Sequence, residues 1–267
     1  MCMRLALTNY SPFIDEIAAA AARTCRSEQC VDRDELGEKQ VKGTIEYIND
    51  VRHYSTLEHN ILTFMVDDIS RVCSHQLVRH RHGSYSQQSH RMLKKKSFRQ
   101  PSKGVASNPE ALRLYNESSD RSYGDYEKLI ALGVPEEEAR DVLPQRITTS
   151  LYFSCNATEL LNSFFPQRLC ERAQGEINSL AYGMLVASKL VAPVVFAGAG
   201  TNCAAGRCRE KEKTERCGGA LKRLRHADEI AKLNMPAFHA TERGRYLDVP
   251  LELLDLAYDM KLLVRKI

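Results

Sequence analysis

The sequence predicts an α+β fold. Segments with strand character lie far apart in the chain and do not alternate regularly with helical segments, as they would in a doubly wound parallel sheet. Hydrophobic residues make up 43% of the 267 residues, which is enough to bury a core, and charged residues make up 27%. This length fits one large domain or a domain with an appendage.

The first elements expected are a strand, two helices and a second strand. Residues 3–8 have strand character, and Ser11 followed by Pro12 predicts the N-cap and first turn of a helix. A second helix is expected over residues 38–50, where apolar side chains recur every three or four positions. Residues 61–66 are rich in β-branched and aromatic side chains, so they predict a strand.

Helices dominate the expected middle of the chain. Ser70 is a suitable N-cap for a helix that continues to about residue 82. Asn108 and the proline after it predict the start of a helix that ends near residue 132. Pro135 and the three glutamates after it predict a short helix that ends before Pro144.

The clearest strand in the sequence covers residues 146–155. Asn156 then predicts an N-cap, and Glu159 stands three residues later, as in a capping box. Pro166 is expected to break or kink that helix. A long amphipathic helix should follow and end near residue 191.

The composition changes at about residue 197. A Gly- and Cys-rich stretch followed by charged residues predicts a loop or linker, after which two helices are expected, over residues 220–232 and after Pro250. Cys203, Cys208 and Cys217 are separated by four and eight residues, which is not a paired CxxC pattern, so we expect no metal site.

Composition also indicates the class of protein. The nine cysteines show no disulfide-framework spacing, the N-terminus has no signal-peptide pattern, and no stretch approaches 18 uninterrupted apolar residues. We therefore expect a cytoplasmic protein with free thiols and no membrane span. The net charge of +4 suits anionic substrates but is lower than that of a dedicated nucleic-acid binder.

The stretch RHRHGSYSQQSHRM, residues 79–92, concentrates hydrogen-bond donors. On a helix over residues 70–82, Gln76 shares a face with Arg79 and His80, and in an extended run Gln87, Ser89 and Arg91 project to one side. Arginine forks bind phosphate oxygens bidentately, so a helix end beside such a run would suit a phosphate. The alternative is a solvated polar helix that runs into a loop.

Several motifs in order resemble those of the flavin-dependent thymidylate synthases. The signature RHR, seven residues and serine matches Arg79–Arg81 with Ser89. The segments RHYSTLEH, SRVCSHQLVRHR, ARDVLP and CNATELLNSFFPQRLCERAQGEI are similar to further family motifs. The resemblance covers roughly residues 1–200, which leaves residues 201–267 as a linker and C-terminal helical extension.

The resemblance implies a fold and a reaction. The fold would place long helices on a small, mostly antiparallel sheet. The reaction would convert dUMP to dTMP with methylenetetrahydrofolate as carbon donor and FAD, reduced by NADPH, as hydride source. The family also implies a homotetramer with shared active sites, with dUMP and folate as its small-molecule partners.

Family motifs carried over residue by residue imply a set of site residues. His53 would lie near the reaction centre, and Arg168 would favour the N3-ionised, nucleophilic form of the uracil. Arg140 would reach the nucleotide from another subunit. The implied FAD contacts are Ser55, Arg79, His80, Arg81, Gln87, Asn156 and Asn162. The implied nucleotide contacts are Gln76, Arg79, Gln87, Gln88, Ser89, His90, Arg91, Arg140 and Arg168.

The sequence departs from the family pattern at a few positions. Thr158 stands where the family has a flavin-contacting arginine, Met92 replaces a tyrosine, and Asn178 replaces an arginine. These departures keep open a relative that methylates another uridine nucleotide, such as UMP. A second alternative, from a different class, is an RNA-binding protein that uses the basic stretch.

Overall fold

A five-stranded sheet forms the centre of the molecule. The computed structural model describes residues 3–91, 97–208, 210, 217–240 and 247–250. The strand order is β3-β4-β2-β1-β5, and each pair of neighbours is antiparallel, which confirms the α+β prediction. The strands are β1 (Arg4–Tyr10), β2 (Ile61–Ser70), β3 (Ser84–Gln87), β4 (Thr148–Asn156) and β5 (Leu247–Pro250).

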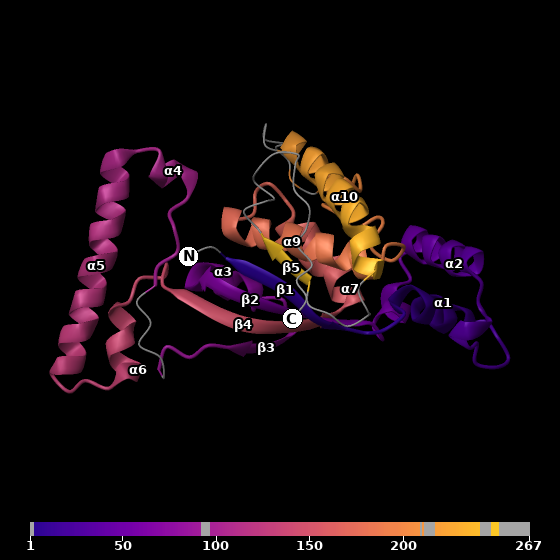
Figure 1. The fold of residues 1–267 in the computed structure, drawn as a ribbon, viewed down its shortest axis with the longest axis horizontal. Helices are drawn as coiled ribbons and strands as arrows, with labels where there is room; N and C mark the ends of the chain where they lie inside the picture. Colours follow the sequence, from indigo (N-terminus) through magenta and orange to yellow (C-terminus); the bar gives the residue numbers. More distant parts are fainter. Residues whose placement is uncertain (1–2, 92–96, 209, 211–216, 241–246, 251–267) are drawn as a thin grey trace.

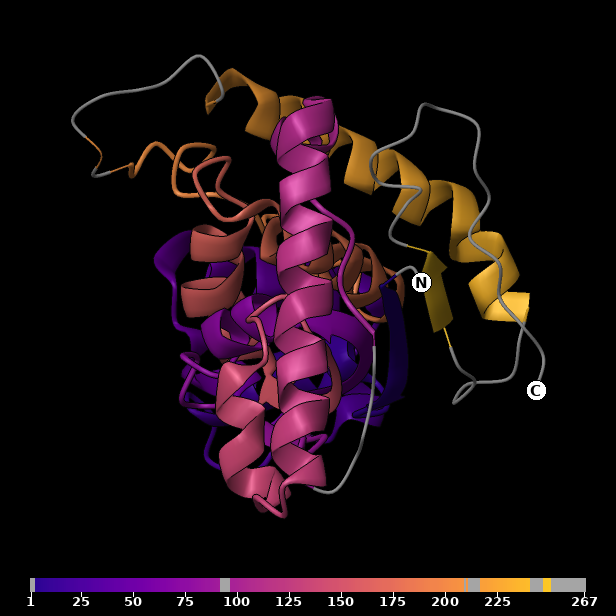
Figure 2. The same ribbon diagram turned by 90° about the vertical axis from the view of Figure 1, so that its left-hand side faces the viewer.

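The helices gather in three places around this sheet (Figure 1). α9 and α10 cover one side of it, α1 and α2 form a pair at one end, and α5 and α6 project from the other end. Figure 2, seen from the side of α5, shows it as a long rod in front of the rest of the molecule, and Figure 1 shows that it stands away from the sheet. The helices are α1 (Ile14–Thr24), α2 (Glu38–Val51), α3 (Arg71–Leu77), α4 (Lys103–Ala106), α5 (Pro109–Ala131), α6 (Glu136–Ala139), α7 (Ala157–Glu159), α8 (Phe165–Arg168), α9 (Gly175–Val191) and α10 (Cys217–Ala240).

The main core lies between the sheet and α9. Alternate residues of β2 and β4, among them Phe64 and Phe153, are fully buried against this layer. The prediction that the helix ending at residue 191 is amphipathic was wrong, because every residue of α9 from Ala181 to Leu190 is buried. The physical reason is a second layer: α10 packs on the side of α9 that a surface helix would expose to water.

Most predicted elements are confirmed, with one wrong N-cap. α1 begins at Ile14 and not after Ser11, because the Ser11 hydroxyl accepts a hydrogen bond from the Ile61 N–H at 2.9 Å and thereby joins β2. Asn108 does cap α5, and Asn156 caps α7 through the Glu159 N–H at 2.8 Å. Pro166 lies in α8, directly after a π-helical turn over Leu160–Phe164.

The helix expected over residues 70–82 is shorter than predicted and ends at Leu77. The Tyr85 hydroxyl lies 2.9 Å from the Leu77 carbonyl oxygen and 2.8 Å from that of His80, so carbonyls that a longer helix would use internally face this side chain. Ser70 accepts the Cys73 N–H at 3.0 Å, which confirms the predicted N-cap.

The C-terminal part adds a helix and a strand. α10 contains the predicted helix over residues 220–232, and β5 pairs with β1 at the edge of the sheet, which was not predicted. The helix expected after Pro250 lies outside the described residues. Within the described part of the chain, every helix is too short or too polar to cross a bilayer.

Candidate functional site

The chain reversal between α3 and β3 carries the Arg- and His-rich stretch. Gly83 lies so close to the sheet that a Cβ atom there would come within 2.4 Å of the Phe153 Cε2 atom. Tyr85 stacks on Phe153 with 5.0 Å between ring centroids and 10° between ring planes. The reversal is therefore fixed by packing on the core, which gives the residues before Gly83 a defined position.

Arg168, the last residue of α8, reaches this reversal. Its Nε–H donates to His80 Nε2 at 3.0 Å, and its Nη2 donates to the Gln76 carbonyl oxygen at 3.1 Å. Its Nη1 lies 3.5 Å from Gln76 Oε1. Burial lowers the pKa of Arg168, opposed by smaller interactions with Cys73 and Tyr85. The structure thus brings together three of the predicted residues, in a partly buried cationic group.

His80 is only 3% exposed, and both of its ring nitrogens are occupied. Nδ1 lies 3.1 Å from Glu159 Oε1 and 3.1 Å from Ser163 Oγ, while Nε2 faces Arg168. Burial lowers the pKa of His80, and the Arg168 charge lowers it further against the opposing hydrogen bond to Glu159. In this arrangement the ring nitrogens of His80 are not available to FAD.

The backbone around Arg168 is anchored from the next helix. The Asn178 side-chain amide donates to the carbonyl oxygens of Arg168 at 2.8 Å and of Cys170 at 3.1 Å. Arg223 of α10 donates to the Asn178 Oδ1 atom. Asn178, one of the departures from the family pattern, therefore ties Arg168 to both α9 and α10.

A second group of predicted residues lines a cavity of about 530 Å³ between β3 and the base of the α5–α6 projection. Gln87, Gln88, Ser89 and His90 line it together with Arg140, and Arg71 adds a further cation. The lining includes none of Gln76, Arg79 and Arg168. Arg140 thus shares a cavity with Gln87–His90 of its own chain, whereas the sequence prediction brought Arg140 to that nucleotide group from another subunit.

Hydrogen bonds hold the strand side of this cavity. Gln87 Nε2 donates to Ser74 Oγ at 3.0 Å and to Thr149 Oγ1 at 3.2 Å, and His90 Nε2 lies 3.0 Å from the Thr148 carbonyl oxygen. Exposed Arg91 stands nearby and pairs with Glu137 at 2.8 Å.

The remaining predicted residues lie elsewhere. Arg79 and Arg81 are exposed, and the Arg79 Nη2 atom is 3.2 Å from His75 Nε2. Asn162 is exposed, and Asn156 uses its Oδ1 atom as the α7 cap. Met92 lies outside the described residues.

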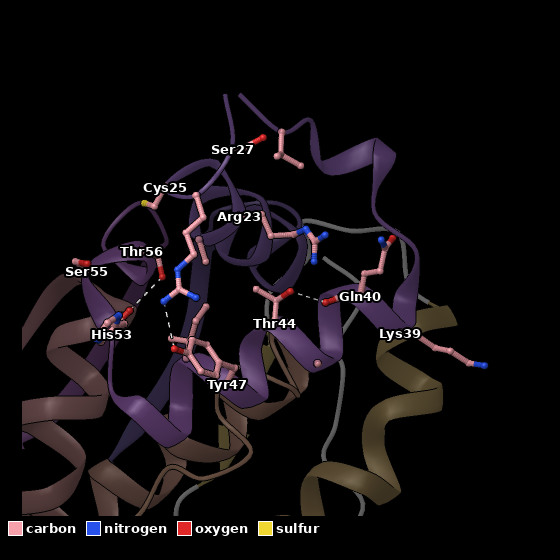
Figure 3. A pocket seen from close by; sticks show the side chains of 15 residues that line it. Arg23, Cys25, Ser27, Lys39, Gln40, Thr44, Tyr47, His53, Ser55 and Thr56 are labelled. Atoms are coloured by element: carbon pink, nitrogen blue, oxygen red, sulfur yellow. Dashed lines mark hydrogen bonds between the residues drawn. The ribbon is translucent and has the colours of Figure 1, made fainter. Parts of the chain in front are cut away.

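His53 and Ser55 line a second cavity, of about 670 Å³, between α1, α2 and the 3-10 helix Tyr54–Leu57 (Figure 3). Three cations, Arg23, Arg26 and Lys39, also line it, and no Asp or Glu is among its described lining residues. The Arg26 Nη2 atom is 3.2 Å from the Tyr47 hydroxyl. The cavity therefore suits an anionic ligand.

Thr158, which stands where the family has an arginine, carries no positive charge. Its hydroxyl donates to the Tyr54 carbonyl oxygen at 2.5 Å, which joins α7 to the 3-10 helix that carries Ser55. A family arginine at this position would instead present a charge.

The surroundings of the buried thiols disfavour the thiolate, which is the nucleophilic form of cysteine. Burial raises the pKa of Cys73 well above its usual range, and burial also raises that of Cys155. In the tail, a hydrogen bond with Cys208 is the largest cause that raises the pKa of Cys203 to about 11. Among the residues described, no group of three or more His, Cys, Asp or Glu is arranged to hold a metal.

Sequence reasoning missed Glu159 as a site residue and did not single out the cations of the cavity beside His53. Glu159 was expected to complete a capping box, a local role, whereas its carboxylate contacts His80, which lies 79 positions earlier in the chain. Arg23 lies in α1, Arg26 in the turn after it and Lys39 in α2, and the sequence alone does not give the pairing of these two helices.

Known proteins resemble this chain over most of its length. The profile of the family described as "Thymidylate synthase complementing protein" matches residues 6–194. A flavin-dependent thymidylate synthase of Geobacter sulfurreducens is 42% identical over 229 residues, which cover 83% of this chain and 97% of the relative. The enzyme of the same name from Sulfolobus acidocaldarius is 38% identical over 204 residues, 75% of this chain and 78% of that protein.

A solved structure shares the fold. The UMP/dUMP methylase PolB of Streptomyces cacaoi, bound with 5-Br dUMP, superposes with a TM-score of 0.67 and 23% sequence identity. The match covers 78% of this chain and 97% of that one. It supports the architecture described above.

Proposed function

The chain belongs to the flavin-dependent thymidylate synthases, and on this premise we propose how its residues divide the reaction. The protein is a flavin-dependent methyltransferase that makes thymidylate. We propose that dUMP is its substrate, methylenetetrahydrofolate its carbon donor, FAD its flavin and NADPH its reductant. The observation that carries the proposal is the partly buried guanidinium of Arg168, held by His80 and Gln76.

Arg168 is the proposed catalytic cation. Uracil becomes nucleophilic at C5 when its N3 loses a proton, and a fixed cation beside the ring stabilises the resulting anion. Such a contact is strongest where water is excluded, and Arg168 is partly buried. Its guanidinium has further N–H donors besides those directed at His80 and Gln76, because arginine carries five.

The cavity of Gln87–His90 and Arg140 is proposed to take the nucleotide phosphate. Arg71 and Arg140 can bind phosphate oxygens through their forks, and the Ser89 hydroxyl can add a hydrogen bond. Exposed Arg91 stands beside this cavity and could exchange its partner Glu137 for a phosphate.

The predicted nucleotide contacts fall into two separate groups, which supports a site assembled from two protomers. Gln76 and Arg168 form one group, while Gln87–His90 and Arg140 line a cavity elsewhere on the same chain. We propose that one nucleotide contacts the first group of one protomer and the second group of a neighbour, in a homotetramer. Exposed Arg79 and Arg81 would then be covered by the neighbouring chain.

The residues present fit FAD. A dinucleotide flavin is anionic at its diphosphate, and the exposed guanidiniums of Arg79 and Arg81 together with the acid-free cavity beside Ser55 supply matching charge. Arg79, Arg81, Ser55 and Asn162 would hold the group. When bound, it supplies the hydride.

The cavity with His53 also suits the anionic co-substrates. Methylenetetrahydrofolate carries carboxylates and NADPH carries phosphates, and Arg23, Arg26 and Lys39 are the cations available to them here. His53 lies at the wall of this cavity (Figure 3), and we propose that it faces these ligands.

One experiment tests the proposal. Purified protein with FAD, dUMP, methylenetetrahydrofolate and NADPH should form dTMP, and NADPH oxidation should accelerate when dUMP is added. A parallel reaction with UMP tests the alternative substrate; we expect dUMP because the relatives at 42% and 38% identity are thymidylate synthases by name. A colourless protein that forms no dTMP and binds oligonucleotides in a strongly salt-dependent way would refute the proposal.

A further inference from the structure

Glu159 has a buried carboxylate that contacts His80 and does not complete the capping box expected from the sequence. It is 6% exposed, and its N–H donates to the Asn156 cap, while its Oε1 atom lies 3.1 Å from His80 Nδ1. Burying a carboxylate costs free energy unless hydrogen bonds compensate it. An apolar side chain would pack at this position without that cost, so its value lies in what the carboxylate does for His80.

The contacts of His80 determine which of its nitrogens carries the proton. Arginine Nε–H can only donate, so His80 Nε2, at 3.0 Å from it, must be the acceptor. A neutral imidazole has one proton, which must then be on Nδ1, facing Glu159 Oε1 and Ser163 Oγ at 3.1 Å each. The hydrogen bonds therefore all point one way, from Arg168 through His80 to Glu159.

We propose that Glu159 is a positioning residue for Arg168. By holding the His80 proton on Nδ1, it keeps Nε2 free to accept the Arg168 Nε–H, which sets the orientation of the guanidinium plane. The carboxylate–imidazole pair acts here as it does wherever a carboxylate fixes a functional histidine in one tautomer. The inference deepens the proposed function, because it rests on the role given there to Arg168.

Loss of the carboxylate should release this orientation. If the proton moves to Nε2, two donors, His80 Nε2–H and Arg168 Nε–H, face each other at 3.0 Å, and the guanidinium must turn away. Ser163 alone would then hold Nδ1, and its hydroxyl can donate to that nitrogen as readily as accept from it. The Phe164 ring, 5.0 Å from the imidazole at 72°, keeps the ring itself in place. The expected defect is thus in the proton and the guanidinium, not in the fold.

Four variants separate these effects. Glu159→Leu removes the acceptor, and Glu159→Gln keeps an oxygen but removes the charge and can present a donor instead. Ser163→Ala removes only the hydroxyl at the same nitrogen, so it is the matched control for contact with Nδ1. Glu58→Gln changes an exposed carboxylate and controls for loss of charge.

The first measurement needs no substrate. Nitrogen NMR of the flavin-bound protein with ¹⁵N-labelled histidine should show His80 protonated on Nδ1 in the wild type, in Ser163→Ala and in Glu58→Gln. The Glu159 variants should show a mixture of tautomers or the Nε2–H form. A wild-type His80 protonated on Nε2, or an unchanged tautomer in both Glu159 variants, would overturn the inference whatever the activity.

The second measurement links the tautomer to the reaction. Ultraviolet absorbance of bound dUMP reports N3 ionisation, and we expect the pH of half-ionisation to rise in Glu159→Leu, with a smaller rise in Glu159→Gln. Turnover should fall about tenfold to a hundredfold, the range found for outer partners of metal-bound histidines. If Glu159→Leu does not fold, Glu159→Gln decides. In an active wild-type background, unchanged half-ionisation in a folded Glu159 variant would refute the inference alone, whereas failure of the wild type to form dTMP would refute the proposed function.

Discussion

Gly83 offers the most direct test of how the site is built. In Gly83→Ala the new Cβ atom would come within 2.4 Å of Phe153 Cε2 and 3.0 Å of the Tyr85 hydroxyl. Phe153 is fully buried and packs against the rings of Phe64, Tyr85 and Phe164, so it has no free space to enter. Overpacking of this kind costs about 1–3 kcal/mol.

The assay is urea unfolding of the purified protein beside a matched glycine. Gly124 lies inside α5, where a Cβ atom would meet nothing within 4 Å, so Gly124→Ala should stabilise by roughly 0.5–1 kcal/mol. For Gly83→Ala we expect a midpoint lowered by about 1 M, taking about 2 kcal/mol over a slope of about 2 kcal/mol per M. We also expect weaker FAD binding, because Arg79 and Arg81 lie in the displaced turn. A Gly83→Ala variant as stable as the wild type would show that the reversal is not fixed by contact with Phe153.

Four further predictions follow from the described contacts. Arg168→Ala should lower dTMP formation about a hundredfold while NADPH oxidation changes far less, and Arg168→Lys should restore only part of the lost dTMP formation. Steady-state rates of both reactions check this. Full dTMP formation by the alanine variant would exclude a catalytic role for Arg168. Thr158→Arg should tighten FAD binding by adding a cation, measured by calorimetry, although it loses the bond to Tyr54; weaker binding would contradict the assignment. Cys73→Ala should keep turnover once folded and flavin-bound, because burial keeps this thiol protonated; a flavin-bound variant without any turnover would implicate the thiol. Asp15, whose carboxylate accepts the Val194 and Val195 N–H groups, has its pKa raised by burial from 3.8 to about 6, so the folded protein holds this proton more tightly than the unfolded chain. Its contribution of about 3 kcal/mol is present below pH 4 and lost as the pH rises through 6, and Asp15→Asn should remove that part of the pH dependence in urea titrations.

Local patterns predicted most of the secondary structure, and long-range contacts account for the errors. The helix over residues 38–50 and the strand over residues 146–155 were found because their apolar periodicity reports burial directly. Ser11 failed as an N-cap because its partner is a strand N–H 50 residues away, and the helix after Ser70 ended early where Tyr85 faces its carbonyls.

The candidate site was predicted as a set of residues but not as an arrangement. Motif order predicted Arg168, Gln76 and His80 as site residues but not the hydrogen bonds that join them, in which both His80 nitrogens face protein partners. The contact of Glu159 with His80 could not be predicted from the sequence, because a capping box with Asn156 already accounts for a glutamate at this position. The contact of Arg140 with a nucleotide held by another subunit stays a prediction; within its own chain, Arg140 lines a cavity with Gln87.

The link from Arg223 through Asn178 to Arg168 affects how this protein can be recombined with its relatives. Asn178 lies inside the region that the family profile matches, while Arg223 lies beyond its last matched residue, 194. A chimera that joins residues 1–200 of this chain to a foreign C-terminus would keep Asn178 but lose the guanidinium that holds its oxygen. Conversely, a relative given this tail would have no amide for Arg223 to contact if it keeps the arginine usual at position 178. The useful crossover point is therefore before residue 168, so that the proposed catalytic arginine, its amide anchor and the tail helix are inherited as one unit.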